Sequence, residues 1–256
     1  MEKILLAQFI GHIIADFFAQ SEHISRQKQE KGPRSWHIYI HAFIVLAASL
    51  AMTFTYGFIV YALGITIIHF AIDVLKSVIE RRLKRRKGNR DGSYSNLYLF
   101  FIDQVLHIAT IYGVVAIFWT KNHSMPTYLD IFTTHQLLIL TGFLLCVKPS
   151  NVIIRICLSS LNLYDQEDNK NDLERAGRWI GTIERIMAVI LVMLQQYTAI
   201  GFIITAKSVL RYNDSKIGKT EYVLIGTLLS FSIALVIGIG IKDGFFESFL
   251  KYISCG

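Results

Sequence analysis

The stretch that decides the fold is residues 59–79, which read IVYALGITIIHFAIDVLKSVI. It is apolar enough to cross a membrane, yet it carries His69 and Asp73, four residues apart and therefore on one face of a helix. An ionisable side chain in the hydrocarbon of a bilayer costs about 2.5 to 3.5 kcal/mol on insertion scales. Such a pair is expected only where it meets partners inside a protein.

Three other apolar segments carry the same residue types. Two of them repeat the spacing of four residues between a histidine and an aspartate, and the remaining one holds a histidine with a second histidine one helical turn earlier. Together the four segments contain seven candidate site residues. These are His12, Asp16, His41, His69, Asp73, Asp103 and His107.

The composition restricts the class of protein. Of the 256 residues, 53% are hydrophobic, and they come in long runs typical of a polytopic membrane protein. The formal net charge is +7, but the basic residues cluster in loops, where they determine topology, so no nucleic-acid partner is expected. The three cysteines, Cys146, Cys157 and Cys255, show no CxxC spacing, which argues against a zinc knuckle or a disulfide framework.

These patterns predict an all-α membrane protein of about six to eight helices. We expect residues 1–125 to form a four-helix transmembrane bundle that carries the His/Asp cluster, and residues 126–256 to form a C-terminal transmembrane or helical region. The spans expected in the bundle are 4–19, 36–55, 58–79 and 98–119. Those expected in the C-terminal region are 131–147, 179–206 and 222–241, with a short amphipathic piece at 151–163.

The depth of the ionisable residues within their spans is the strongest signal for a shared site. Basic loops after the first and third spans belong on the cytoplasmic side of a bacterial inner membrane by the positive-inside rule. At a helical rise of about 1.5 Å per residue, the candidate residues lie about 8 to 16 Å from the cytoplasmic ends of their spans. Antiparallel packing would then bring all seven into one layer, in the cytoplasmic half of the bilayer.

Imidazole and carboxylate together suit a divalent metal, with Zn as first choice and Mn or Fe as alternatives. Seven ligands exceed the needs of one tetrahedral ion, so either two bridged ions or one ion with outer carboxylates that orient the histidines would fit. Asp16, Asp73 and Asp103 are the candidates for catalytic ligand or general base. Two other interpretations use the same residues: hydrogen bonds between helices, and a proton relay or ion pathway.

A metal centre near the lipid headgroups predicts a metal-dependent hydrolase or phosphotransferase that acts on a lipid-like or phosphorylated substrate, such as a lipid phosphate. Four polar residues share faces or neighbouring turns with the candidate ligands and could support them: Gln20, His37, Lys76 and Gln104. The basic loops could attract an anionic headgroup. The alternative is a metal-ion or proton-coupled transporter that uses the cluster as its binding site. A third hypothesis is a membrane sensor or scaffold in which the site is structural.

The C-terminal region carries fewer signals. Glu184 and Arg185 lie one to two turns inside an apolar span, where ion pairs are expected, either between the two or with Lys207 or Glu221 of a neighbouring helix. Glycine-containing stretches at 226–227 and 238–240 allow close helix contact, either within the bundle or in a homodimer through the C-terminal helices.

Four motifs can be quoted from the first half of the chain: Gly11-His12-x-x-x-Asp16-Phe17-x-x-Gln20, His37-x-x-x-His41-Ala42, His69-Phe70-x-Ile72-Asp73-x-x-Lys76 and Asp103-Gln104-x-x-His107. Over about the first 125 residues, these resemble a bacterial integral-membrane family described only as a domain of unknown function. Later motifs resemble the C-terminal extension of many members: Gly181-x-x-Glu184-Arg185, Lys207 and Glu221-Tyr222-x-Leu224-Ile225-Gly226-Thr227. The resemblance supports the His/Asp motifs as a genuine pattern, but it implies no activity or substrate. The pattern is also loosely similar to bacterial inner-membrane metal-dependent hydrolases, which is an analogy only.

Overall fold

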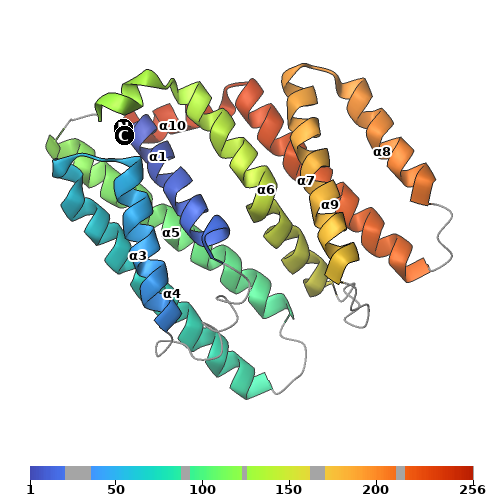
Figure 1. Ribbon diagram of the computed structural model, residues 1–256, viewed down its shortest axis with the longest axis horizontal. Helices are drawn as coiled ribbons and strands as arrows, with labels where there is room; N and C mark the ends of the chain where they lie inside the picture. The colour runs from blue at the N-terminus through green and yellow to red at the C-terminus, as the bar shows by residue number, and fades with distance from the viewer. Residues whose placement is uncertain (21–35, 88–92, 123–125, 162–170, 212–216, 256) are drawn as a thin grey trace. The chain divides into compact units, whose positions relative to one another are not determined.

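A computed structural model describes residues 1–20, 36–87, 93–122, 126–161, 171–211 and 217–255 (Figure 1). All regular structure in these residues is helical, which confirms the all-α class. They form two compact units, Met1–Thr141 with Leu250–Gly256, and Gly142–Phe249. Of the two basic segments that helped to orient the protein from its sequence, 21–35 lies outside the described residues, whereas the run at 81–90 is helical up to Lys87 and only its last residues fall outside them.

The first unit is organised around a ring of four helices (Figure 1). In chain order these are α1 (Glu2–Ile13), which continues into the π-helical turn η1 (Ile14–Phe18), α3 (Trp36–Met52), α4 (Ile59–Lys87) and α5 (Ser93–Asn122). Helix α1 packs against α3 and α5, α3 packs against α4, and α4 packs against α5, so the ring is closed. Two 3-10 segments, η3 (Tyr56–Phe58) and η4 (Thr127–Ile131), lie in the connections.

This ring is apolar outside and partly polar inside, the reverse of a soluble bundle. On α4, Val60 and Ile67 are exposed, whereas His69, on the opposite face, is buried. Helices α4 and α5 contain segments long and apolar enough to cross a membrane, Tyr56–Leu83 and Leu97–Asn122. Helix α3 and the combined α1 and η1 are also apolar but fall short of the about 20 residues of a typical span.

The register of α1 against α3 is set by a close approach and a polar contact. A Cβ atom on Gly11 would lie 3.3 Å from the Ala48 carbonyl oxygen, so only glycine fits there without displacement. One turn away, Gln8 Nε2 donates to the Ser49 carbonyl oxygen at 2.9 Å, and Ser49 Oγ donates to Gln8 Oε1 at 2.7 Å. Interhelical hydrogen bonds of this kind hold helices together in apolar surroundings, and here they position His12 on the next turn of α1.

The remaining α-helices are α6 (Thr134–Ser160), α7 (Asn171–Met193), α8 (Tyr197–Arg211), α9 (Ile217–Lys242) and α10 (Phe245–Cys255). In the second unit, α7 packs against both α8 and α9. Thr134–Ser160 and Val223–Lys242 also have the length and hydropathy of membrane spans. Among the described residues, four helices therefore meet the criteria for crossing a membrane, which is the pattern of a polytopic membrane protein.

Helix α6 passes through Pro149 without a break, although the sequence predicts separate segments at 131–147 and 151–163. Pro149 has no N–H to donate to the Leu145 carbonyl oxygen four residues earlier. The hydroxyl of Ser150 donates to that same oxygen at 2.6 Å. Because the unpaired carbonyl receives a replacement donor, the helix continues to Ser160 instead of stopping.

The single span predicted at 179–206 is two helices, α7 and α8. Gln195 adopts a left-handed conformation, with φ of 60°. Its N–H bonds to the Val192 carbonyl oxygen at 3.0 Å, and the Gln196 N–H bonds to the Leu191 carbonyl oxygen at 2.8 Å. This pair of bonds is a Schellman ending, in which glycine usually holds the left-handed position. A glutamine there carries no sequence signal for a helix end, so the break was missed.

Candidate metal centre

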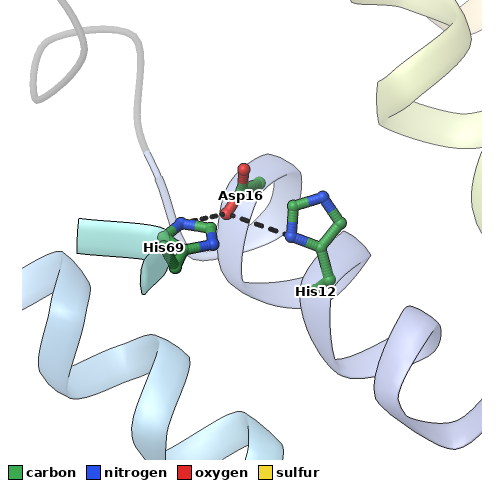
Figure 2. A group of neighbouring side chains, drawn as sticks. All are labelled: His12, Asp16 and His69. Atoms are coloured by element: carbon green, nitrogen blue, oxygen red, sulfur yellow. Dashed lines mark ion pairs between the residues drawn. The ribbon is translucent and has the colours of Figure 1, made fainter. Parts of the chain in front are cut away.

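Each helix of the ring contributes to one buried cluster of imidazoles and carboxylates. Helix α1 and η1 supply His12 and Asp16, α3 supplies His41, α4 supplies His69 and Asp73, and α5 supplies Asp103 and His107. The structure brings together all seven residues singled out from the sequence. Their side chains are between 1% and 13% exposed. Figure 2 shows Asp16 between the rings of His12 and His69, which come from different helices.

Asp16 reaches the cluster through a π-helical turn. The Ala19 N–H bonds to the Ile14 carbonyl oxygen five residues earlier, at 2.8 Å. The wider turn changes the direction of the Asp16 side chain relative to a continued α-helix, and it leaves Asp16 Oδ1 3.7 Å from His12 Nδ1. Single π-turns inside helices are rare and occur often at functional sites.

Two carboxylate oxygens in this cluster each lie close to the same two imidazole nitrogens. His41 Nε2 and His69 Nε2 lie 3.2 Å apart. Asp16 Oδ1 lies 3.3 Å and 3.4 Å from these two nitrogens, and Asp73 Oδ2 lies 3.5 Å and 3.9 Å from them. A tetrahedral zinc ion bound at about 2.0 to 2.1 Å requires ligand-to-ligand distances of about 3.3 to 3.4 Å. We call these four residues the primary site, because each carboxylate has an oxygen near both imidazoles.

Several buried polar atoms of the cluster form no hydrogen bond with any described residue. They include Asp16 Oδ1, Asp103 Oδ1 and both ring nitrogens of His107. A buried polar atom without a partner costs about 1 to 3 kcal/mol. Such a concentration of unsatisfied acceptors and ring nitrogens suits a cation, because a cation would satisfy several of them at once.

The charges in the cluster also fit a divalent ion. Asp16, Asp73 and Asp103 contribute three negative charges, and Lys76 contributes one positive charge through its ammonium group, 2.8 Å from Asp103 Oδ2. With neutral histidines, two negative charges remain in a buried place, which is costly. One divalent cation would neutralise them.

Further contacts hold the ligands in position. Gln104 Oε1 lies 3.4 Å from His12 Nε2, while its amide nitrogen donates to Asp103 Oδ2 at 3.2 Å, so one side chain orients two members of the cluster. The rings of His69 and His107 stack with their centroids 3.9 Å apart. Outer contacts of this kind commonly fix the orientation of metal-binding imidazoles and carboxylates.

A family model described as "Protein of unknown function (DUF3307)" matches residues 4–138, more than half of the chain. The chain belongs to the DUF3307 family. No curated protein and no solved structure matches it. The matched residues include α1, α3, α4 and α5, so the whole His/Asp cluster lies within the DUF3307 part of the chain. An uncharacterised family of this kind assigns no activity to the cluster.

A polar column beside the cluster was missed in the sequence. Gln8, Ser49 and Thr53 are buried and bonded to one another, one to three turns along α1 and α3 from His12 and His41. A signal was present, because Gln8 precedes His12 and Asp16 at the same four-residue spacing. It was overlooked because glutamine and serine are uncharged and do not interrupt an apolar run strongly.

Beyond the DUF3307 match, the ionisable pair in α7 behaves in two different ways. Glu184 forms an ion pair with Lys207, as expected for this segment. Arg185 instead donates to neutral acceptors, at 2.7 Å to the Cys146 carbonyl oxygen and at 3.0 Å to Ser230 Oγ. Because these acceptors lie on α6 and α9, the guanidinium group ties three helices of the second unit together.

Proposed function

We propose that this protein is an integral-membrane metal-dependent hydrolase or phosphotransferase of the bacterial inner membrane. Its centre would lie in the cytoplasmic half of the bilayer, and its substrate would be lipid-like or phosphorylated. The observation that carries the proposal is the primary site. The Nε2 atoms of His41 and His69 lie 3.2 Å apart, and each lies 3.3 to 3.9 Å from an oxygen of Asp16 and of Asp73. Spacing this short among buried imidazoles and carboxylates is that of ligands around one ion.

Zinc is the first candidate for the ion because two imidazoles and two carboxylates suit it, with manganese or iron as alternatives. Bound there, a divalent cation would activate water and neutralise charge on the oxygens of a phosphate ester. Asp16 and Asp73 would act as ligands. Asp103 is the candidate general base, because its Oδ1 forms no hydrogen bond with a described residue and lies 3.5 Å from His107 Nε2.

Access to the cluster supports an anionic substrate at the membrane surface. Side-chain exposure rises from 3% at His41 to 13% at Asp73 and 27% at Lys76, so the cluster is most open on the side of Asp73 and Lys76. Further along α4 in the same direction, Arg82 and Arg85 are exposed. Basic side chains at this end of a membrane helix would attract a lipid phosphate or another anionic headgroup.

The second candidate function is a metal-ion or proton-coupled transporter. It is favoured by the polar column of Gln8, Ser49 and Thr53, which extends buried polar groups along α1 and α3 beyond the cluster. A continuous line of buried polar groups is typical of ion and proton pathways. Depth does not separate the two functions, since His69 and His107 lie near the middle of the apolar segments Tyr56–Leu83 and Leu97–Asn122. The hydrolase is preferred because the cluster is most open toward Lys76, where an anionic headgroup could enter.

The test uses purified full-length protein in detergent micelles that contain phosphatidic acid or a phosphodiester lipid. We expect release of phosphate or of the headgroup, loss of this activity after chelation, and its return when Zn or Mn is added back. Asp16→Asn should abolish the activity, whereas Asp130→Asn, which alters an exposed aspartate paired with Lys3, should retain it.

Two results would contradict the proposal. A purified protein that contains no stoichiometric metal, and gains none on reconstitution, would remove its basis. Metal-dependent uptake into proteoliposomes without any hydrolysis would replace the hydrolase with the transporter.

A further inference from the structure

We propose that the ammonium group of Lys76 occupies the position of a second metal ion, so that the centre holds one divalent cation and one lysine in place of two cations. This inference rests on the proposed function, because it requires an ion in the primary site. It extends that function by specifying the number of ions and a role for a residue outside the seven residues of the cluster.

A second set of donor atoms lies beside the primary site. His107 Nε2 is 3.5 Å from Asp103 Oδ1 and 3.9 Å from Asp73 Oδ1. His107 and Asp103 are almost fully buried, and neither His107 nitrogen nor Asp103 Oδ1 forms a hydrogen bond with a described residue. These three atoms have the chemistry and spacing of three ligands of a second metal site.

The Asp73 carboxylate joins the two sets. Its Oδ2 faces His41 and His69 of the primary site, at 3.5 Å and 3.9 Å, and its Oδ1 faces His107. A carboxylate shared in this way is the usual bridge in sites that hold two ions about 3.5 to 4 Å apart. The side chains alone would therefore be suited to two ions.

Lys76 disfavours the second of these two ions. Its Nζ lies 2.8 Å from Asp103 Oδ2, on the carboxylate that a second ion would need, and 5.9 Å from the centre of the Phe100 ring. A fixed positive charge at this position repels a second dication. It also completes the balance of charge, since one dication and one ammonium group together neutralise Asp16, Asp73 and Asp103.

The arrangement gives Lys76 a function in binding substrate. Lys76 is more exposed than the seven residues of the cluster and lies on its open side. An ammonium group there can contact a phosphate oxygen as a point charge, which is the task of the second ion in a two-metal centre. Unlike an exchangeable ion, the lysine stays in the site when metal is scarce.

The experiment counts metal ions per chain in purified, zinc-reconstituted full-length protein by elemental analysis. We expect one ion in the wild type and two in Lys76→Met, since the methionine removes the charge but keeps the unbranched stem. Lys76→Gln is a second neutral variant with the same expectation. Lys76→Arg, which keeps the charge, should hold one ion.

Two controls test whether the extra ion enters the second set of atoms. Lys207→Met removes a part-buried lysine that is paired with Glu184 in the other unit, and it should leave the count at one. Adding Asp103→Asn to Lys76→Met should return the count from two to one. In manganese-loaded Lys76→Met, electron paramagnetic resonance should show the exchange coupling of two nearby ions, whereas the wild type should show an isolated ion.

The outcomes separate this inference from the function on which it rests. A wild-type protein without metal would refute the metal-dependent function itself. One ion in the wild type and also one in both neutral Lys76 variants would overturn the role of Lys76 and leave the primary site intact. Two ions in the wild type would likewise overturn it, because the lysine would not be excluding the second ion.

Discussion

Replacing His41 by alanine should weaken zinc binding far more than replacing His12 by alanine. The two imidazoles are similarly buried, at 3% and 5% exposed, so burial does not distinguish the two substitutions. They differ in their place in the cluster. His41 Nε2 is a member of the primary site, 3.2 Å from His69 Nε2, whereas His12 contacts that site through Asp16, at 3.7 Å.

The expected magnitudes follow from this difference. A structural zinc ion with four ligands contributes about 10 to 16 kcal/mol, or about 2.5 to 4 kcal/mol for each ligand. At about 1.4 kcal/mol for each tenfold change, loss of His41 should raise the dissociation constant about 10²- to 10³-fold. Loss of an outer residue that orients a ligand costs about 10- to 100-fold, which is the range expected for His12.

The assay is competition against a chromogenic zinc chelator in detergent micelles, at one fixed pH for all proteins. Circular dichroism establishes that each variant keeps its helical content. If His12→Ala weakens binding as much as His41→Ala, or more, then the ion does not lie between His41, His69, Asp16 and Asp73, and the assignment of the primary site is wrong.

Three further predictions concern the helices and the ion. Ser150→Ala should lower the free energy of unfolding by about 0.5 to 1.5 kcal/mol in denaturant titrations, because the Leu145 carbonyl oxygen loses its donor. In a Pro149→Ala background the same substitution should have almost no effect, since the backbone N–H of residue 149 then replaces the hydroxyl as donor to that oxygen. Gly238→Ala should destabilise the second unit by about 1 to 3 kcal/mol, because the new Cβ would lie 2.9 Å from the Val192 Cβ. Gly226→Ala, whose Cβ would meet only Leu158 Cδ1 at 3.4 Å, serves as its tolerated control. Removing the metal by dialysis against a chelator should lower the temperature of unfolding. Adding zinc at about 100 times its dissociation constant should restore about 2.7 kcal/mol of stability. Equal melting curves for the metal-free and the zinc-loaded protein would contradict a bound ion.

Much of the fold could be predicted because the environment of a membrane helix leaves few choices. A run of apolar residues as long as that around His69 must be helical in lipid, since every backbone N–H and carbonyl needs a partner within its own segment. The cluster could be predicted for the related reason that His69 and Asp73 are too costly to face lipid. Their common depth with His107 required that the helices pack side by side.

Helix ends were harder to predict because they depend on single hydrogen bonds. Pro149 is a strong stop signal in a sequence, yet one hydroxyl from Ser150 keeps α6 intact. Gln195 is a weak stop signal, yet its left-handed conformation separates α7 from α8. Both outcomes depend on where one donor lies in space, and the residue type alone does not specify this.

The amino-acid sequence by itself determined that the chain is helical, that it has the character of a membrane protein, and that imidazoles and carboxylates share one layer of a bundle. Periodicity and the cost of charge in hydrocarbon are enough for those conclusions, because both act on each helix separately. Only the tertiary structure decided which atoms face one another: that Asp16 turns inward through a π-helical turn, that His41 and His69 are 3.2 Å apart, and that Lys76 bonds to Asp103. Those distances depend on the rotation of each helix about its axis and on the packing between helices, which a single helix cannot encode.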